Sequence, residues 1–259
     1  MALDVRGDIA AAQLAFYVPI AGICLFYFAR FLLSRDAGWM MLAIFALIRV
    51  AGGVLTVVTQ TIENPSVDLY IVAYLLFHVG FGFLLLAAIG FLSLGGYRSY
   101  SDEMGVRRLY YLVAILATIG FALSIPAGLL GTHVNDNISV GNILRRVAAC
   151  VYAAAFIILF MTTIIGWTHR YLMRSYRRKF LGGVTFSMLF LGARAAFEIL
   201  AAWSAEDPFG SRSSPNPTLA MFNPTTGDWV PFLVMGLICE FAAAATYVLS
   251  GALLHRRHP

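Results

Sequence analysis

The sequence predicts an all-α fold, a polytopic membrane protein built as a seven-transmembrane-helix bundle. Three observations lead to this prediction. Of the 259 residues, 60% are apolar and only 12% are charged, whereas a soluble domain carries about 25% charge. The apolar residues form blocks long enough to cross about 30 Å of hydrocarbon at about 1.5 Å per residue. Short polar segments separate the blocks and carry most of the charge.

Each block is expected to be a helix, because lipid offers no hydrogen-bonding partner to an open backbone. The blocks also exceed the about 10 residues of a transmembrane barrel strand. The expected spans, in chain order, are Leu14–Leu33, Trp39–Thr59, Val67–Leu92, Leu109–Leu130, Val147–Thr168, Phe180–Trp203 and Trp229–Leu254. Because no repeat or second domain is visible, residues 1–259 are predicted to form a single transmembrane domain.

The distribution of Lys and Arg predicts the orientation of the bundle. Of the 18 such residues, 12 fall on one side of the membrane: Arg30, Arg35, Arg98, Arg107, Arg108, Arg170, Arg174, Arg177, Arg178, Lys179, Arg256 and Arg257. The other side holds 4, namely Arg6, Arg145, Arg146 and Arg212, and Arg49 and Arg194 lie within spans. Cytoplasmic loops carry the excess of basic residues. We therefore expect a lumenal N-terminus and a cytosolic C-terminus, with the endoplasmic reticulum as the default membrane.

Two of the expected non-cytosolic loops carry information. The segment Ala205–Asp228 contains four prolines with Gly and Ser, so it is expected to lie irregularly over the mouth of the bundle, where it could act as a lid. The loop between the fourth and fifth expected spans contains Asn137-Ile138-Ser139, an acceptor for N-glycosylation. Its modification would confirm the orientation.

Five ionisable residues are expected at membrane depth: Arg49, His78, Arg194, Glu198 and Glu240. Such residues are costly in hydrocarbon and are expected to face the bundle interior. Arg194 and Glu198 are four residues apart, so they lie on one helix face and can pair. Glu240 is the remaining acidic partner for Arg49. Two structural ion pairs are as consistent with the sequence as a functional site, and both interpretations place these charges around one interior volume.

The candidate chemistry is proton transfer. A carboxyl group kept from water in an apolar cavity favours its protonated form and can act as a Brønsted acid. Glu240 and Glu198 are the candidate acids, with Arg194 and Arg49 tuning or orienting them. His78 is a packing residue or a proton relay. Aromatic rings within the spans can stabilise a cation, although most are expected to be packing or lipid-facing: Phe16, Tyr17, Tyr70, Tyr74, Phe77, Phe81, Phe83 and Phe197.

Several motifs are missing from the sequence. It has no G-x-x-x-x-G-K-[ST] phosphate loop, no H-E-x-x-H pair and no G-x-S-x-G elbow, which argues against ATP-driven, zinc-peptidase and serine-hydrolase functions. Aspartate-rich runs that would hold magnesium against a diphosphate are missing too, and the three cysteines are far apart. We therefore expect no cofactor and no metal. The sole lysine, Lys179, lies in a loop, which excludes a retinal Schiff base, and the basic loops orient the chain rather than bind nucleic acid.

Three stretches carry a resemblance to a known group of proteins: Ala15-Phe16-Tyr17-Val18-Pro19, Gly38-Trp39 through Leu47-Ile48-Arg49, and Phe222-Asn223-Pro224-Thr225-Thr226-Gly227-Asp228-Trp229 followed by Glu240. They resemble small fungal seven-helix membrane proteins, whose characterised members are membrane-bound terpene cyclases of meroterpenoid pathways, of the ascofuranone and macrophorin type. The resemblance implies metal-independent protonation of an epoxide or a terminal alkene on a prenyl chain, followed by ring closure.

The predicted function is therefore that of an integral membrane terpene cyclase, acting on a prenylated hydrophobic small molecule that enters from the bilayer. Two alternatives remain open at the level of sequence. Seven helices with an external N-terminus is also the topology of receptors, although the loops are short. A lipid or drug exporter with arginine and glutamate in its sixth span is the second alternative.

Overall fold

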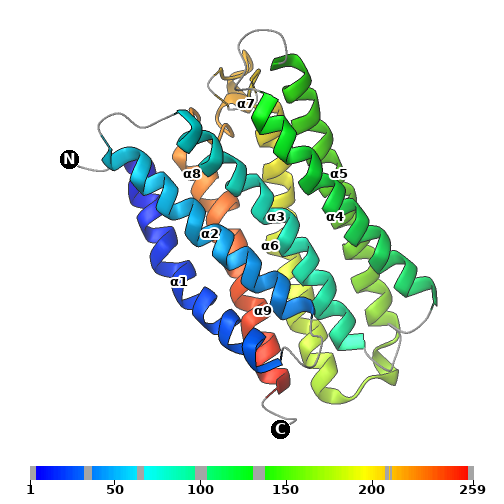
Figure 1. Cartoon of the computed structure of the whole chain (residues 1–259). Coiled ribbons are helices and arrows are strands. Elements are labelled where there is room, and N and C mark those ends of the chain that lie inside the picture. Colours follow the sequence, from blue (N-terminus) through cyan, green and yellow to red (C-terminus); the bar gives the residue numbers. More distant parts are fainter. Residues whose placement is uncertain are drawn as a thin grey trace.

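Seven long helices run side by side in the bundle, as predicted (Figure 1). The computed structural model describes residues 4–31, 37–62, 67–96, 104–130, 138–207, 210 and 212–255. Six of the spans are single helices: α1 Val5–Phe31, α2 Ala37–Thr61, α3 Val67–Gly96, α4 Met104–Leu130, α5 Ile138–Thr168 and α6 Ser175–Trp203. A short turn of helix, η2 (Arg170–Leu172), lies between α5 and α6.

The seventh span is composite. It begins as α8 (Trp229–Pro231), widens into the π-helical segment η3 (Phe232–Ile238) and continues as α9 (Cys239–His255). Pro231 lies in the first turn, where a missing backbone N–H costs no hydrogen bond. Pro19 and Pro126, by contrast, lie inside α1 and α4, which continue past them.

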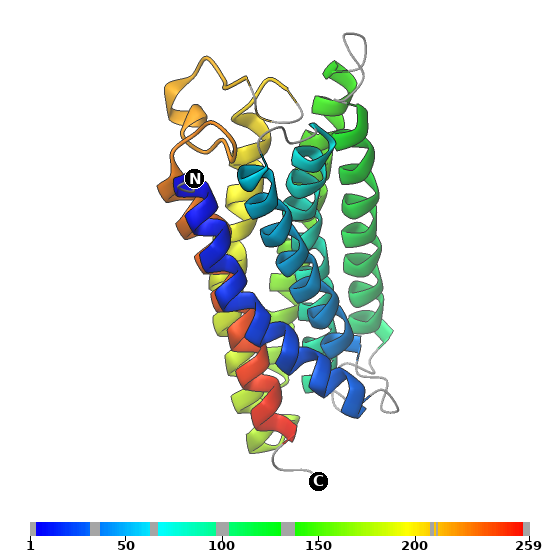
Figure 2. The ribbon, with the colours of Figure 1, turned by 60° about the vertical axis from the view of Figure 1, so that its left-hand side comes forward.

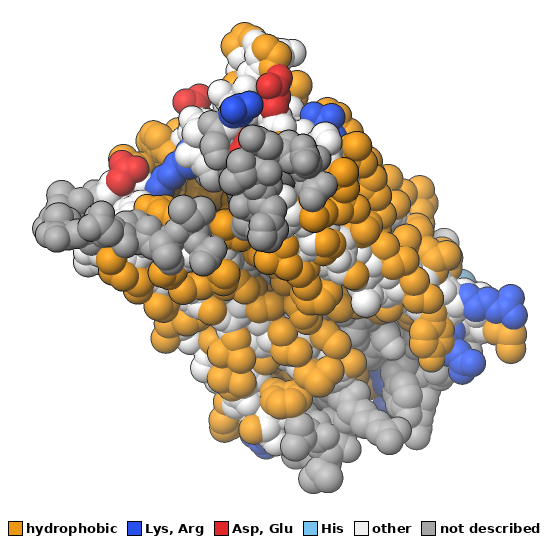
Figure 3. All heavy atoms as spheres, turned by 45° about the horizontal axis from the view of Figure 1, so that its top comes forward, with side chains coloured by type: hydrophobic (Ala, Val, Ile, Leu, Met, Phe, Trp, Pro, Cys, Tyr) orange, Lys and Arg blue, Asp and Glu red, His pale blue; other side chains and the backbone are white. Residues whose placement is uncertain are grey.

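All seven spans are long and apolar enough to cross a membrane, so the chain is an integral, multi-pass membrane protein. Apolar side chains also cover the outside of the bundle (Figure 3), with exposed fractions of 68% for Leu189 and 58% for Ile115. Lipid-facing side chains have this character, whereas water-exposed apolar patches of such extent are rare in soluble proteins.

Two helices begin about nine residues earlier than the sequence predicted. The first span was expected from Leu14 but α1 begins at Val5, and the fifth was expected from Val147 but α5 begins at Ile138. The charged residues in these extra turns suggested loops. In the structure their guanidinium groups instead bond to backbone carbonyls of neighbouring segments, Arg6 to Pro224 and Arg145 to Ala202. Both guanidinium groups therefore have hydrogen-bond acceptors inside a helical segment.

The half of the bundle near the chain's C-terminus is filled with aromatic rings. Trp39 stacks on Tyr27 with ring centroids 4.5 Å apart and meets Phe91 edge-on at 5.3 Å. Phe91 in turn stacks on Tyr247. Trp39, Phe91 and Tyr247 are fully buried. These rings fill the space between the helices at this end, and the large cavity lies in the other half.

The segment between α6 and α8 covers the opposite end of the bundle, where the N-terminus lies (Figure 2). It contains the short helix α7 (Pro217–Ala220). Asn223, fully buried, donates to the carbonyl of Gly210, and its side-chain oxygen accepts from Thr225 N–H. Arg6 of α1 donates to the carbonyls of Pro224 and Gly227 at 2.7 and 2.9 Å. The expected irregular cover is thus present and is tied to α1.

Candidate functional site

The five ionisable residues expected at membrane depth form one continuous chain of contacts in the bundle interior. Arg49 on α2 donates from Nε to Glu240 Oε1 at 2.7 Å, and Arg194 on α6 donates from Nε to Glu240 Oε2 at 3.0 Å. Arg194 also pairs with Glu198 one turn later, and Glu198 Oε2 lies 2.8 Å from His78 Nδ1. All five residues are at least nine-tenths buried.

Both pairs predicted from the sequence, Arg194 with Glu198 and Arg49 with Glu240, are present. The contact between Arg194 and Glu240 was not predicted, and it joins the two pairs into a single network. His78 also joins the network through Glu198, a contact that the sequence did not predict. Whether any of these residues acts in catalysis remains a prediction.

Aromatic rings enclose the two arginines of this network. The guanidinium carbons of Arg49 and Arg194 each lie 4.8 Å from the centroid of the Phe77 ring, on α3. Arg194 also lies 5.3 Å from the Phe81 ring and 5.6 Å from the Phe197 ring. Such contacts are favourable because the negative ring faces attract the cations.

The two carboxyl groups differ in their partners. Both oxygens of Glu240 accept hydrogen bonds from guanidinium groups, and such charge-assisted bonds are strong. Glu198 instead shares its contacts between one permanent cation, Arg194, and one titratable group, His78. Glu198 is therefore the carboxyl group of the network that contacts a histidine, whereas Glu240 contacts two arginines.

A cavity of about 390 Å³ opens between α1, α2, α3 and the start of the seventh span. Its wall includes aromatic rings of Tyr70, Tyr74, Phe77 and Phe232, and Arg49 lies at its inner end. Its volume falls within the range of about 300–1,000 Å³ that is typical of sites for small organic ligands. Pro224 and Thr225 from the covering segment also line it.

Polar groups in this cavity gather toward the N-terminal end of the bundle, around Asp4, Arg6, Gln60 and Tyr70. The side-chain oxygen of Gln60 is buried without a hydrogen-bond partner among the described residues. A ligand group that donates a hydrogen bond would satisfy this oxygen.

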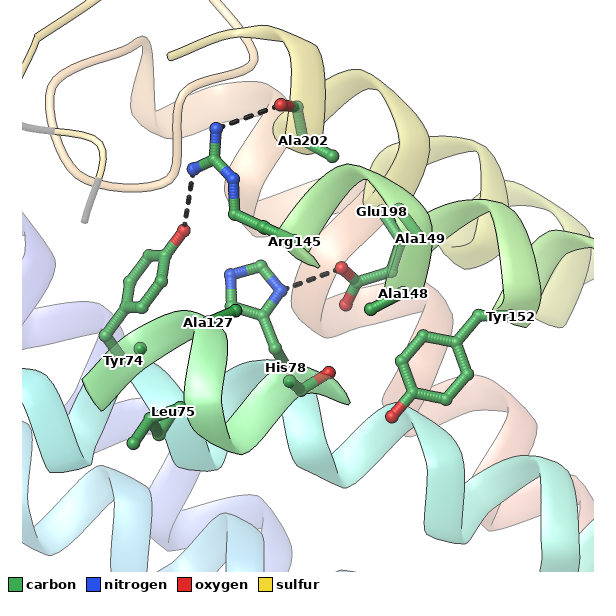
Figure 4. Close-up of a pocket in the computed structure, with 12 residues that line it drawn as sticks. Tyr74, Leu75, His78, Ala127, Arg145, Ala148, Ala149, Tyr152, Glu198 and Ala202 are labelled. Atoms are coloured by element: carbon green, nitrogen blue, oxygen red, sulfur yellow. Dashed lines mark hydrogen bonds and ion pairs between the residues drawn. The ribbon is translucent and has the colours of Figure 1, made fainter. Parts of the chain in front are cut away.

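A second, much smaller chamber of about 20 Å³ is also lined by Tyr74 (Figure 4). His78, Glu198, Ser124 and Arg145 contribute polar groups to its lining. Figure 4 shows the His78 ring between Tyr74 and Glu198, with the guanidinium of Arg145 beside the Tyr74 hydroxyl. Tyr74 lines both the chamber and the large cavity.

Arg145 is a buried site residue that the sequence analysis placed at the membrane surface. It is only 7% exposed. Its guanidinium donates to the Tyr74 hydroxyl at 3.2 Å and to the carbonyls of Ala202 and Ala205 at 2.9 and 3.1 Å. A signal was available, because Arg145 shares a helical face with the buried residues Gly141, Ala148 and Tyr152, at the spacing typical of an inward face.

The candidate aromatic residues divide between site and surroundings. Tyr70, Tyr74 and Phe77 line the large cavity, and Phe81 and Phe197 contact Arg194. Phe16 is 56% exposed on the outside of the bundle. Within the described ranges, no three His, Cys, Asp or Glu side chains lie close enough together to hold a metal ion.

The family of the chain follows from comparison with known proteins. A domain of unknown function, DUF7702, matches residues 3–257. The chain belongs to the DUF7702 family. The match spans all seven helices of the bundle, so the buried network and both cavities lie within the DUF7702 domain. Neither curated proteins nor solved structures gave a match.

Proposed function

We propose that this DUF7702 protein is an integral membrane terpene cyclase, which protonates the end of a prenyl chain and closes it into a ring. The observation that carries the proposal is the cavity of about 390 Å³, walled by aromatic rings, whose inner end is Arg49 of the buried charge network. Cyclisation of a prenyl chain requires aromatic rings that stabilise the carbocation and a nearby source of protons.

The shape of the cavity suits an elongated amphipathic substrate. Gln60 and Arg49 lie eleven residues apart on α2, both in the cavity lining, which corresponds to about 16 Å along a helix. The polar head of a prenylated arene would lie near Gln60 and Tyr70, and its prenyl chain would extend past Phe77 toward Arg49. This orientation brings the reacting end of the chain to the charge network.

The proposed roles follow from the contacts. Arg49 donates a hydrogen bond to an epoxide oxygen at the end of the chain, and Glu240 fixes Arg49 in place. The His78–Glu198 pair supplies the proton. When the epoxide oxygen gains this proton, one C–O bond breaks, and the electrons of a neighbouring double bond form the new C–C bond. The final carbocation then loses a proton to the enzyme, so the product is an isomer of the substrate. With a terminal alkene, protonation at carbon starts the same sequence.

A test compares Glu198→Gln, Glu240→Gln and the control Glu206→Gln, which changes an exposed carboxylate, in membranes supplied with farnesyl and epoxy-farnesyl arenes. We expect Glu198→Gln to lower turnover by about 10²-fold or more, and Glu240→Gln to lower it through misplacement of Arg49. Full turnover in both variants would refute the acid assignment.

The same experiment separates the cyclase from the exporter and the receptor. A cyclase gives a product of unchanged mass and altered retention time on a chromatographic column. An exporter moves the substrate across sealed vesicles without such a product, and a receptor binds it without either change.

We also propose that the N-terminal end of the bundle faces the lumen of the endoplasmic reticulum and the C-terminal end faces the cytosol. The excess of Arg and Lys at the latter side supports this orientation.

A further inference from the structure

The small chamber beside Tyr74 contains buried polar groups that the described protein atoms leave unsatisfied. His78 Nδ1 faces Glu198, and the other ring nitrogen, Nε2, is buried with no hydrogen-bond partner among the described residues. Nε of Arg145 is likewise buried with no hydrogen-bond partner among the described residues. The exposed fraction is 9% for residue His78 and 7% for residue Arg145. Buried polar atoms of this kind are normally satisfied by protein or by an ordered water molecule.

The size of the chamber matches a single water molecule. Its volume is about 20 Å³, and one buried water needs at least about 10–15 Å³ and two to four polar partners. The lining supplies such partners from separate helices: His78 from α3, Ser124 from α4, Arg145 from α5 and Glu198 from α6. A prenyl chain is far too large for this space.

The surroundings of Arg145 strengthen the case for a polar occupant. Its hydrogen-bond acceptors are all uncharged: the Tyr74 hydroxyl, the Asn142 side-chain oxygen and two backbone carbonyls. An arginine so held keeps part of its charge unneutralised, and a water dipole placed nearby is favourable.

We infer that this chamber is a binding site for one water molecule, which joins His78 to Tyr74 and makes Tyr74 the residue that passes protons into the large cavity. The ring centroids of Tyr74 and His78 lie 4.6 Å apart, and Arg145 fixes the Tyr74 hydroxyl at the edge of the chamber. The water site stands on the geometry alone, whereas the proton transfer rests on the proposed cyclase function.

The transfer conserves protons at each step. The imidazolium of His78, held by the Glu198 carboxylate, gives its Nε2 proton to the water. The water gives a proton to the Tyr74 oxygen as the Tyr74 hydroxyl proton moves to the substrate, where the C–O bond of the epoxide breaks. The proton lost from the final carbocation returns to His78 by the reverse route.

The first experiment is an experimental structure of the full chain at a resolution that shows ordered water. We expect one solvent peak about 2.7–3.2 Å from His78 Nε2. In Ala148→Val, whose added methyl groups enter the chamber from α5, the peak should be lost. Ala154→Val, an exposed position on the same helix, should retain it. An empty chamber in the unmodified protein overturns the inference.

The second experiment measures cyclisation of an epoxy-farnesyl arene. Tyr74→Phe and Ala148→Val should lower kcat by about 10²-fold with KM unchanged, and Ala154→Val should match the unmodified protein. Undiminished kcat in Tyr74→Phe overturns the relay, even if the water is present. If the unmodified protein cyclises no prenyl arene while the water peak is observed, the proposed function fails and the water site stands.

Discussion

At the scale of single residues, Glu240 balances more buried charge than any other carboxylate that the structure describes. It is fully buried and contacts both Arg49 and Arg194. A buried cation that loses its partner is costly, because no water compensates its charge. The fold itself therefore depends on this residue, apart from any chemistry at the site.

Glu240→Gln is accordingly expected to destabilise the folded protein by about 3–5 kcal/mol. The double variant Arg49→Gln/Glu240→Gln removes one charge of each sign and leaves Arg194 paired with Glu198, so it should be more stable than Glu240→Gln alone. Thermal unfolding in detergent measures both. Equal losses in the single and double variants would show that the network contributes packing rather than charge balance.

The sequence predicts some site residues and misses others for physical reasons. Arg49, Arg194, Glu198 and Glu240 stood out because charge is costly at membrane depth, and charge balance alone suggested their pairing. Arg145 was missed because a helix can extend beyond the apolar block that identifies it, so a charge in the first turns resembles a loop charge. The partner of His78 was not predictable, since contacts between helices depend on their rotation.

At the scale of helices, α2 and α3 approach each other closely at a pair of glycines, Gly38 and Gly90. A Cβ on Gly90 would lie 2.5 Å from the backbone nitrogen of Gly38, well inside van der Waals contact. Small residues at such positions let helix backbones meet in a membrane. The approach sets the crossing that delivers Arg49 from α2 and His78 from α3 to the same network.

Gly90→Ala should therefore destabilise the bundle by about 1–3 kcal/mol, since backbone atoms must move apart. Gly22→Ala is the matched control, because a Cβ there meets nothing within 4 Å and alanine favours a helix. Thermal unfolding in detergent compares the two. A Gly90→Ala variant as stable as Gly22→Ala would contradict the close approach.

Arg6 of α1 forms hydrogen bonds to the segment between α6 and α8, and these bonds can be tested. Arg6→Gln removes donors to the carbonyls of Pro224 and Gly227, so hydrogen exchange across residues 221–228 should become faster. Arg212→Gln is the control, because the contact of Arg212 with Asp207 is made by its backbone nitrogen. Unchanged exchange in Arg6→Gln would show that the segment is held by its own internal bonds.

Among the elements, the sequence predicted the existence of all seven spans, since each apolar block is long enough to cross the membrane. It did not predict the π-helical segment η3, because a wider turn arises from packing rather than from a residue pattern. Phe232 of η3 lines the large cavity. In the seventh span, the sequence thus predicted Glu240 but not the wider turn that places Phe232 in the cavity wall.

At the scale of the whole molecule, orientation is open to a direct test. Asn137, which lies outside the described residues, should carry an N-glycan if the N-terminal end is lumenal. Glycosidase treatment should shift the mobility of the unmodified protein, and Asn137→Gln should remove the shift. A tag at the C-terminus should react in cells permeabilised only at the plasma membrane. A tag that stays protected, together with an unglycosylated Asn137, would indicate the inverted orientation.

The aromatic packing of Trp39, Phe91 and Tyr247 limits how a molecule could pass through the bundle. In the proposed orientation, these rings lie between the large cavity and the cytosolic leaflet. Conduction across the membrane would require these fully buried rings to separate. The proposed cyclase needs no such separation, because its product can leave by the path that its substrate entered.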